Sequence, residues 1–360
     1  MFLADDKIFM ARALKLAVRG RGHVSPNPLV GCVLVKNGSI IGEGYHENFG
    51  GSHAEITAFR NSSKDPKDST AYITLEPCCV AGKTPPCTKA LMERGVREVY
   101  IAMLDPNPLV NGRGAGELKR AGIIVHTGIL QEEAEDQNKA FSKWITTGRP
   151  WVSAKVAQSA NGYMGIDSQT SIWLTGEASK KHVHQLRTQV DAIMVGRNTA
   201  LVDNPKLTLR KAVGRNPKRI VTDTHCTLPL TLHLFQDGEA ETIILCSEQK
   251  FKQNQTAFYK YIPIKEENGY LSPEHILQVL GEEGITSLLI EGGYELLSSF
   301  KRADMIDEVY VYTTPETLEN AELKNPIQIS SYWEIRKEQV LGSDHLIVAE
   351  KRKVECLQEL

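Results

Sequence analysis

The order of apolar and polar positions in the first 130 residues predicts alternating helices and strands. Apolar residues at helical spacing cover residues 5–18. Residues 29–46 form two apolar runs around Asn37-Gly38, a sequence typical of a β-hairpin. The later segments are expected as helix 53–63, strand 71–77, helix 85–95, strand 96–105, helix 115–122 and strand 123–129. This alternation favours a three-layer α/β sandwich.

A second alternating region follows residue 150. A helical segment at 132–148 ends in Gly148-Arg149-Pro150, and a new strand begins at residue 151. We therefore place a boundary near Gly148, which gives domains 1–147 and 148–360. Further buried strands are expected at 191–201, 218–224, 241–247, 285–293 and 307–314.

Composition narrows the class of protein. A length of 360 residues suits two or three domains, and 42 basic against 44 acidic residues give a net charge of −2. That charge argues against a surface built for nucleic acid but leaves room for a basic pocket that binds one phosphate. No apolar run approaches the length of a membrane helix, and the N-terminus does not resemble a secretory signal. Seven cysteines, an odd number, favour a reducing compartment, and we expect the cytoplasm.

Three of the seven cysteines fall between residues 78 and 87, and His53-Ala54-Glu55 precedes them. One imidazole and two thiolates leave the fourth position of a tetrahedral zinc ion open, as a catalytic site requires. Zinc lowers the pKa of a bound water towards about 7, and Glu55 is well placed to move protons. The pattern H-x-E followed by P-C is that of zinc deaminases. Cys79 is expected to point away, because neighbouring residues of an extended segment face opposite sides.

The segments HAE (53–55), TLEPC (74–78), GKTPPC (82–87) and DPNPLVNGRG (105–114) closely resemble the deaminase half of the RibD family of riboflavin-biosynthesis enzymes. Eight residues separate Cys78 from Cys87, where the commonest deaminase signature has two, and the longer spacing is typical of the riboflavin deaminases. The resemblance implies that the zinc ligands are His53, Cys78 and Cys87 and that the proton donor is Glu55. It also implies pyrimidine and ribose-phosphate contacts by Asn27, His46, Lys83 and Asn107. Val80 departs from the family, where many relatives have histidine.

The second half contains no G-x-G-x-x-G after a strand, so a Rossmann dinucleotide site is not supported. Its segments 155–165, 171–178, 194–210, 219–224 and 288–293 resemble, in order, the reductase half of the same family, which implies a dihydrofolate-reductase-like fold and NADPH. The implied cofactor contacts are Ala157, Trp173, Thr199, Asp203, Thr224 and Gly293. The implied substrate contacts are Ser171, Arg187, Leu207, Arg210 and Glu291. The two arginines suit a ribose phosphate, since guanidinium groups bind phosphate bidentately.

Three departures from the family fall in this half. Asn161 stands where the family motif SLDG has aspartate, and Arg197 replaces the valine or isoleucine of a G(V/I)xT segment. The segment 316–330 after Pro315 is shorter than in relatives and has no glycine. Because the residues implied to bind substrate and cofactor are retained, we expect the reductase to be active.

The resemblance therefore implies a bifunctional enzyme of riboflavin biosynthesis that acts on a small molecule. Hydroxide activated by zinc would deaminate 2,5-diamino-6-ribosylamino-4(3H)-pyrimidinone 5′-phosphate. NADPH would then reduce the ribosyl group to give 5-amino-6-ribitylamino-uracil 5′-phosphate. Relatives assemble through the reductase half, so a homo-oligomer is expected.

Three alternatives remain open at this point. The second domain could be catalytically inactive, leaving a deaminase alone. A nucleic-acid-editing deaminase would share the zinc site but needs a basic, aromatic surface, and the most basic stretch, 211–219, is short. A non-catalytic zinc protein would be expected to lack Glu55 or to close the fourth ligand position.

Overall fold

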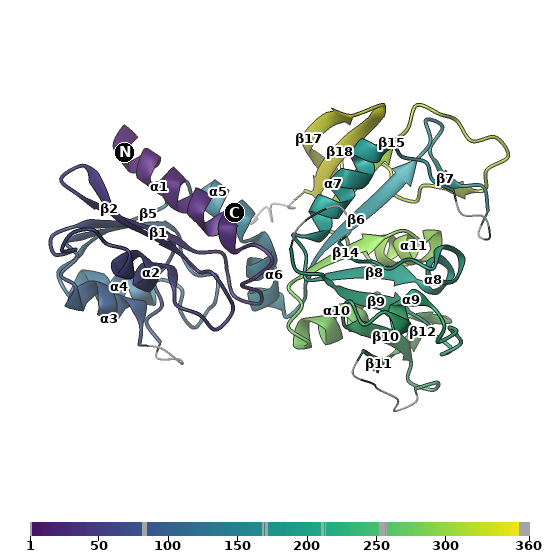
Figure 1. Ribbon diagram of the computed structural model, residues 1–360, viewed down its shortest axis with the longest axis horizontal. Coiled ribbons are helices and arrows are strands. Elements are labelled where there is room, and N and C mark those ends of the chain that lie inside the picture. Colours follow the sequence, from purple (N-terminus) through teal and green to yellow (C-terminus); the bar gives the residue numbers. More distant parts are fainter. Residues whose placement is uncertain are drawn as a thin grey trace, which may run out of the picture. The chain divides into compact units, whose positions relative to one another are not determined.

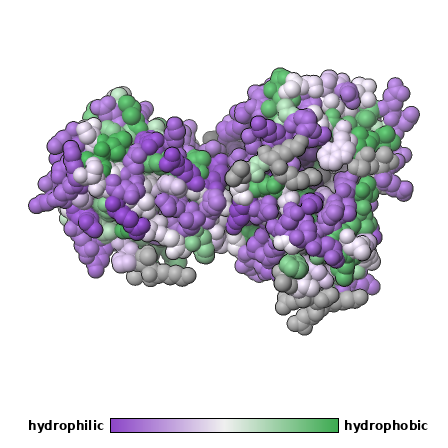
Figure 2. Space-filling model, viewed as in Figure 1, coloured by the Kyte–Doolittle hydropathy of each residue, from purple (hydrophilic) through white to green (hydrophobic). Residues whose placement is uncertain are grey.

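The computed structural model describes residues 2–80, 85–167, 169, 172–209, 212, 214–251, 256 and 258–352. The chain divides into two compact units, Met1–Arg149 and Pro150–Leu360, each of which is described by itself. Within the described residues, no helix has the length and apolar character needed to cross a bilayer. In the view of Figure 2, hydrophilic residues cover most of each unit, as expected when the apolar residues form the cores.

The first unit is built on a five-stranded sheet with the order β2-β1-β3-β4-β5 (Figure 1). Strand β1 is antiparallel to β2 and β3, whereas β3, β4 and β5 run parallel. The strands are β1 (Gly31–Lys36), β2 (Ser39–Tyr45), β3 (Thr70–Leu75), β4 (Glu98–Met103) and β5 (Ile124–Thr127). The helices are α1 (Ala4–Ala17), η1 (Val18–Gly20), α2 (Ala54–Arg60), α3 (Cys87–Glu93), α4 (Arg113–Arg120), α5 (Gln131–Gln137) and α6 (Lys139–Thr147).

Helices cover both faces of this sheet. On one face α1 and α5 contribute Met10 and Ala134 to a buried apolar cluster with the strands. On the other face α2, α3 and α4 contribute Ala58, Leu91 and Leu118 to a second cluster. The three-layer α/β sandwich predicted from the alternating pattern is confirmed.

The predicted hairpin joins β1 to β2. Lys36 pairs with Ser39, so only Asn37 and Gly38 form the loop. Both have positive φ, at 52° and 72°. A two-residue turn of this kind matches the right-handed twist of the strands, and asparagine followed by glycine tolerates that backbone best.

The prediction of one continuous helix over 132–148 was wrong. The segment forms two helices, α5 and α6, which are separated at Asn138, where φ is −109° and ψ is 14°. The buried Asn138 side chain accepts a hydrogen bond from the N–H of Leu29 at 2.8 Å and donates one to its carbonyl at 3.0 Å. These bonds pair the backbone N–H and carbonyl of Leu29, which is far away in the sequence. The helix is interrupted at Asn138, whose side-chain amide makes them.

The second unit is built on a nine-stranded sheet with the order β11-β10-β9-β8-β14-β6-β15-β18-β17. The strands from β11 to β15 are parallel, and β18 and β17 continue the sheet antiparallel. These strands are β6 (Trp151–Gln158), β8 (Ala192–Gly196), β9 (Lys218–Thr222), β10 (Thr242–Ser247), β11 (Tyr259–Ile264), β14 (Ser287–Glu291), β15 (Glu308–Thr313), β17 (Trp333–Leu341) and β18 (Asp344–Lys351). Two short pairs, β7 (Tyr163–Gly165) with β16 (Leu323–Lys324) and β12 (Glu266–Glu267) with β13 (Tyr270–Leu271), lie apart from it.

Helices again cover both faces (Figure 1). Leu186, Ala200 and Phe235 pack one face, and Leu280 and Phe300 pack the other. They belong to α7 (Glu177–Arg187), α8 (Arg197–Asp203), α9 (His233–Gln236), α10 (Pro273–Glu282) and α11 (Tyr294–Arg302). The α/β architecture predicted for this half is confirmed.

One predicted strand of the second unit was too long. Of residues 191–201, only Ala192–Gly196 form β8, and α8 begins directly at Arg197. The apolar residues after Gly196 pack as a helix, because Ala200 joins the buried cluster beneath α8 instead of pairing in the sheet. The hairpin of β17 and β18 was not predicted, since its outer strand exposes most of its residues and has no apolar run.

Candidate active sites

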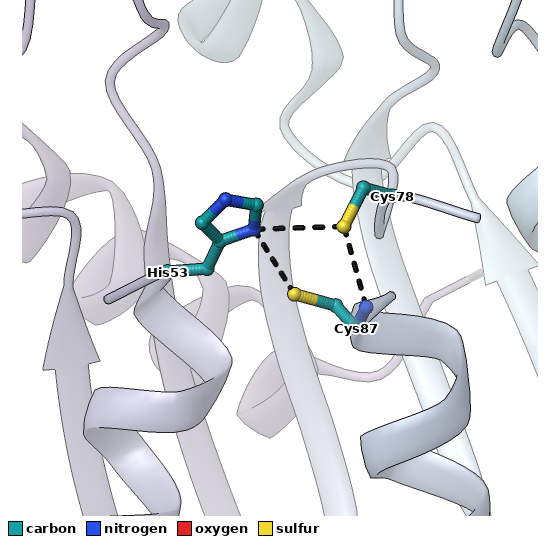
Figure 3. Close-up of side chains that lie close together, drawn as sticks. All are labelled: His53, Cys78 and Cys87. Atoms are coloured by element: carbon teal, nitrogen blue, oxygen red, sulfur yellow. Dashed lines mark hydrogen bonds between the residues drawn. The ribbon is translucent and has the colours of Figure 1, made fainter. Parts of the chain in front are cut away.

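Three elements of the first unit bring His53, Cys78 and Cys87 together. His53 is the N-cap of α2, Cys78 follows β3, and Cys87 is the first residue of α3. Figure 3 shows the three side chains pointing at one another from these separate elements. Parallel strands end at the same edge of a sheet, which is why segments far apart in the sequence meet there.

The spacing of the three side chains suits a metal ion. Their donor atoms all lie within 4.8 Å of one another. His53 Nδ1 is 3.2 Å from Cys87 Sγ and 3.5 Å from Cys78 Sγ. Around a tetrahedral zinc ion, Zn–S and Zn–N bonds of about 2.3 and 2.1 Å place such donors about 3.6 Å apart. One nitrogen and two sulfurs at these distances fit zinc and leave the fourth position without a protein ligand among these three.

Charge favours a thiolate at this place. The hydrogen bond from Cys87 is the main reason why the pKa of Cys78 is well below that of an ordinary thiol. The backbone N–H of Cys87 also donates to Cys78 Sγ at 3.3 Å. Sulfur must be deprotonated to bind a metal, so the site is electrostatically prepared for one.

Glu55 lies on the first turn of α2 and is 3% exposed. Burial raises the pKa of its carboxyl, and the nearby Cys78 adds to the rise. A close approach of α2 to the sheet holds Glu55 in place. At Gly44 of β2 a Cβ atom would lie 2.3 Å from the backbone nitrogen of Ala58, so only glycine permits this packing. This packing fixes the backbone of α2, which carries Glu55 near His53, Cys78 and Cys87.

Two of the predicted pyrimidine contacts adjoin the same cluster. Asn27 Nδ2 lies 3.0 Å from His46 Nε2, and His46 Nδ1 lies 3.0 Å from the carbonyl of Ser52. The rings of His46 and His53 are 5.9 Å apart. Burial is the main cause of a lowered pKa at His46, which favours its neutral form.

Of the other two predicted contacts of this domain, Asn107 lies within the described residues and Lys83 does not. Asn107 accepts a hydrogen bond from the N–H of Leu109 within its own turn, at 3.0 Å. Lys83 lies outside the described residues, and so do Ser171 and Arg210 of the second unit.

Sequence reasoning missed Glu76, the residue before Pro77-Cys78. Its carboxylate is 3% exposed and accepts hydrogen bonds from the backbone N–H groups of Asp105, Gly112 and Ala115, at 3.1, 2.9 and 2.9 Å. One buried charge therefore ties the loop after β4 to the beginning of α4. Its place beside a proposed metal ligand was the available signal.

In the second unit the candidate site is a cavity of about 1270 Å³ over the carboxyl ends of the parallel strands. Its lining includes nine of the predicted residues: Ala157, Arg187, Trp173, Thr199, Asp203, Leu207, Thr224, Glu291 and Gly293. Gly292 and Gly293 both have positive φ, at 83° and 87°. A Cβ atom on Gly293 would lie 3.3 Å from Thr199 Oγ1, so this backbone leaves a cradle that a side chain would fill. The volume and the cradle fit a dinucleotide.

Arg187 and Glu291 form a buried ion pair in this cavity. Arg187 Nε and Nη2 donate to the two carboxylate oxygens of Glu291 at 2.6 and 2.8 Å, and Nη1 donates to the carbonyl of Thr208 at 3.2 Å. Burial would raise the pKa of Glu291, but the charge and hydrogen bonds of Arg187 outweigh it and hold the pKa below its usual value. These three bonds use three of the five N–H donors of the guanidinium, so Nη1 and Nη2 each keep one further N–H.

Lys155 was also missed. It lies on β6 two residues before Ala157, so both side chains are on the same face of the strand, and it lines the cavity. Burial is the main cause of a lowered pKa at Lys155, partly offset by the charge of Glu291. The period of two along β6 was the signal that could have found it.

Known proteins match both units. Residues 150–337 match the family model of the RibD C-terminal domain, and residues 3–103 match that of the cytidine and deoxycytidylate deaminase zinc-binding region. The riboflavin biosynthesis protein RibD of Actinobacillus pleuropneumoniae is 43% identical over 326 residues, which cover 89% of this chain and 87% of that protein. The chain belongs to the RibD family.

Solved structures of relatives have the same fold over almost the whole chain. The match with Acinetobacter baumannii RibD covers 97% of this chain and 99% of that protein, with 33% identity and a TM-score of 0.87. A Thermotoga maritima protein named a diaminohydroxyphosphoribosylaminopyrimidine deaminase/5-amino-6-(5-phosphoribosylamino)uracil reductase gives the same coverage and identity, with a TM-score of 0.86.

Two features that the sequence analysis singled out, Asn161 and the segment 316–330, are connected in the structure. The side-chain amide of Asn161 donates to the carbonyl of Leu318 at 2.9 Å, and its oxygen accepts from the N–H of Leu318 at 3.1 Å. The N–H of Ala160 also donates to the carbonyl of Glu316 at 2.7 Å. Asn161 therefore fastens the shortened segment after Pro315, and an aspartate could make only one of its two bonds to Leu318.

Proposed function

We propose that each domain performs one of two consecutive steps of riboflavin biosynthesis. The first domain deaminates 2,5-diamino-6-ribosylamino-4(3H)-pyrimidinone 5′-phosphate with zinc, and the second reduces the ribosyl group of the product with NADPH. The observation that carries the proposal is the approach of His53, Cys78 and Cys87 within 4.8 Å, with the buried Glu55 two residues from the histidine.

In the first domain, His53, Cys78 and Cys87 are the zinc ligands. Zinc bound there supplies a Lewis acid that activates water at neutral pH. Glu55 takes a proton from the attacking water and passes it to the departing amino group, which leaves as ammonia. Burial raises the pKa of this carboxyl above its usual value, which is the direction that a group carrying a proton between water and the leaving group requires.

His46 and Asn27 are proposed to form the wall of the pyrimidine pocket. Their mutual contact of 3.0 Å fixes the orientation of both side chains. An imidazole held neutral and an amide offer donor and acceptor groups suited to the edge of a base. Lys83 and Asn107 are kept as proposed contacts to the substrate.

In the second domain, bound NADPH would supply a hydride to C1′ of the ribosyl group; the C1′–O4′ ring bond would open, and O4′ would take a proton. The Gly292-Gly293 cradle is proposed to hold the pyrophosphate, with Ala157, Trp173, Thr199, Asp203 and Thr224 as further cofactor contacts. Lys155 is proposed to donate the proton that balances hydride addition, since its ammonium lines the cavity near Glu291. Arg187 is proposed to hold Glu291 in position. The proposed substrate contacts remain Ser171, Arg187, Leu207, Arg210 and Glu291.

One experiment follows both steps separately. The zinc-loaded chain receives the diaminopyrimidine substrate and NADPH, while ammonia and absorbance at 340 nm are recorded in parallel. Glu55→Gln is expected to abolish ammonia release with metal content unchanged, and Cys87→Ser is expected to lose bound zinc. Lys155→Met is expected to stop NADPH oxidation while ammonia release continues.

Each result can contradict part of the proposal. Ammonia release that survives Glu55→Gln would exclude its role as proton carrier. A wild-type chain that releases ammonia without oxidising NADPH, even when the deaminated product is supplied, would select a deaminase with an inactive second domain. As a matched control, Glu47→Gln removes an exposed carboxylate near His46 and is expected to leave both signals unchanged.

We also propose a cytoplasmic location and a homo-oligomer assembled through the second domain. The odd number of cysteines supports a reducing compartment. Light scattering on the purified chain tests the oligomer, and a single species with the monomer mass of 40.0 kDa would contradict it.

A further inference from the structure

One corner of the cavity in the second unit lies over the ends of β8 and β9. Gly196 and Thr222 end these parallel strands and pair in register. Arg197, Thr224 and His225 follow them, and all five residues line the cavity. Arg197 therefore gives this corner of the cavity a positive charge.

Among the described residues, the Arg197 side chain is held through its Nε atom. Its Nε donates to Thr227 Oγ1 at 2.9 Å and lies 3.6 Å from Asp223 Oδ1. Asp223 is fully buried and also accepts the N–H of Leu228 at 2.8 Å, so this anchor is rigid. Both contacts use Nε, which leaves the Nη1 and Nη2 groups of a 44% exposed side chain for a ligand.

The other described arginine and lysine side chains of the cavity are engaged differently. Arg187 donates hydrogen bonds to the carboxylate of Glu291 and to the carbonyl of Thr208. Lys180 pairs with Glu177 at 3.0 Å, and Lys206 pairs with Glu239 at 2.9 Å. Lys155 lies close enough to Glu291 for the carboxylate to affect its pKa. Within the described lining, Arg197 therefore offers the guanidinium fork whose terminal nitrogens are not bonded to a carboxylate.

The order of the strands says which part of the cofactor reaches this corner. Neighbouring strands lie about 4.8 Å apart, so the ends of β9, β8, β14 and β6 span about 14 Å. The Gly292-Gly293 cradle follows β14, in the interior of this row. Lys155 and Ala157 of β6 lie on the side where reduction is proposed, so the nicotinamide belongs there. The adenosine half then extends towards β8 and β9.

We propose that Arg197 binds the 2′-phosphate of the adenosine ribose and thereby sets the preference of this chain for NADPH over NADH. A planar guanidinium pairs bidentately with a phosphate, and the anchor at Nε presents the other two nitrogens for that purpose. Thr224 and His225 add a hydroxyl and an imidazole at the same corner. The inference rests on the proposed reductase function and deepens it, because it names the group that distinguishes the two dinucleotides.

Titration calorimetry on the full, zinc-loaded chain without pyrimidine tests the inference. The ligands are 2′,5′-ADP and 5′-AMP, which differ only in the 2′-phosphate, and NADPH and NADH. Arg197→Gln is expected to weaken 2′,5′-ADP and NADPH by about 10- to 100-fold, the usual worth of hydrogen bonds to a charged group. Binding of 5′-AMP and NADH is expected to change less than about twofold. Arg197→Val, which also removes the guanidinium, is expected to weaken the binding of 2′,5′-ADP and NADPH to the same extent.

Arg215→Gln is the matched control. Arg215 is 48% exposed and pairs with the buried Asp191 at 3.2 Å, yet it does not line the cavity. It is expected to leave the preference for the 2′-phosphate unchanged. Unaltered 2′,5′-ADP binding in Arg197→Gln overturns the inference, and so does an equal loss of 2′,5′-ADP and 5′-AMP, which would mean that Arg197 only shapes the pocket.

The proposed function fails in a different way. A wild-type chain that binds neither NADPH nor NADH would refute the reductase and the inference together. A wild-type chain that binds NADPH and reduces the deaminated product, while Arg197→Gln keeps its preference, would refute the inference alone. Ammonia release measured on every variant verifies that the first domain is folded.

Discussion

Replacing Glu76 by glutamine tests how firmly one buried carboxylate holds the frame of the zinc site. Its two oxygens accept the N–H groups of Asp105, Gly112 and Ala115. The amide of glutamine has one oxygen, so at least one of these N–H groups would face an NH₂ group. We expect the loop 104–116 to lose much of its protection against local opening.

The magnitude follows from the bonds that change. A buried N–H without an acceptor costs about 1–3 kcal/mol, and weakening two bonds to a charge into bonds to a neutral group costs about 1 kcal/mol each. Removing a negative charge at the beginning of α4 adds about 0.5 kcal/mol. The total of about 3.5–5.5 kcal/mol is a large share of the 5–15 kcal/mol that stabilises an average domain.

Hydrogen exchange measured by mass spectrometry on peptides that cover 104–116 is the direct assay. If the loop opens locally, its amides should exchange about 300- to 10,000-fold faster in Glu76→Gln than in the wild type. The control is Glu117→Gln. Glu117 lies on α4, and its side chain makes no hydrogen bond in the described part of the chain. Its replacement removes the same charge. Equal exchange in the wild type and Glu76→Gln, or an equal increase in both variants, would refute the reasoning.

Three further substitutions probe other parts of the molecule. Asn138→Ala leaves the N–H and carbonyl of Leu29 unpaired and is expected to cost about 2–4 kcal/mol, visible as a lower melting temperature; an unchanged melting temperature would contradict this. Gly293→Ala adds a Cβ 3.3 Å from Thr199 Oγ1 at a φ of 87° and should weaken NADPH at least about tenfold with ammonia release intact. NADPH binding as tight as in the wild type would mean that the cradle is not needed. Because burial lowers the pKa of Lys155, reductase activity should fall on the alkaline side below the usual lysine range, as the ammonium loses its proton. Lys155→Arg cannot release a proton, so it should leave only a low residual reductase activity without that fall. A rate and pH profile identical to those of the wild type would exclude Lys155 as the proton donor.

The zinc cluster was predictable from the sequence because each donor belongs to a short local pattern. His53 and Glu55 are two residues apart, and Cys78 and Cys87 flank a single loop. The alternation of helices and strands likewise follows from local periodicity, and most elements of both units were found where the pattern indicated them.

Pairings between distant residues were not predictable in this way. Arg187 and Glu291 are 104 residues apart, and nothing near either one in the sequence indicates that the guanidinium pairs with this carboxylate. Asn138 separates α5 from α6, and its side chain forms hydrogen bonds with Leu29, which is 109 residues away. A sequence pattern reports which face of an element is apolar, whereas these contacts depend on the order of strands and the path of loops.

The bond between Asn161 and Leu318 has a consequence for the path of the chain after Pro315. The two residues are 157 apart in the sequence, yet the amide of Asn161 both donates to and accepts from the backbone of Leu318. An aspartate at position 161 could not donate to the Leu318 carbonyl, which would lose this partner. One side chain therefore supplies both halves of a pairing that a neighbouring strand would otherwise make, and it holds the segment at Leu318.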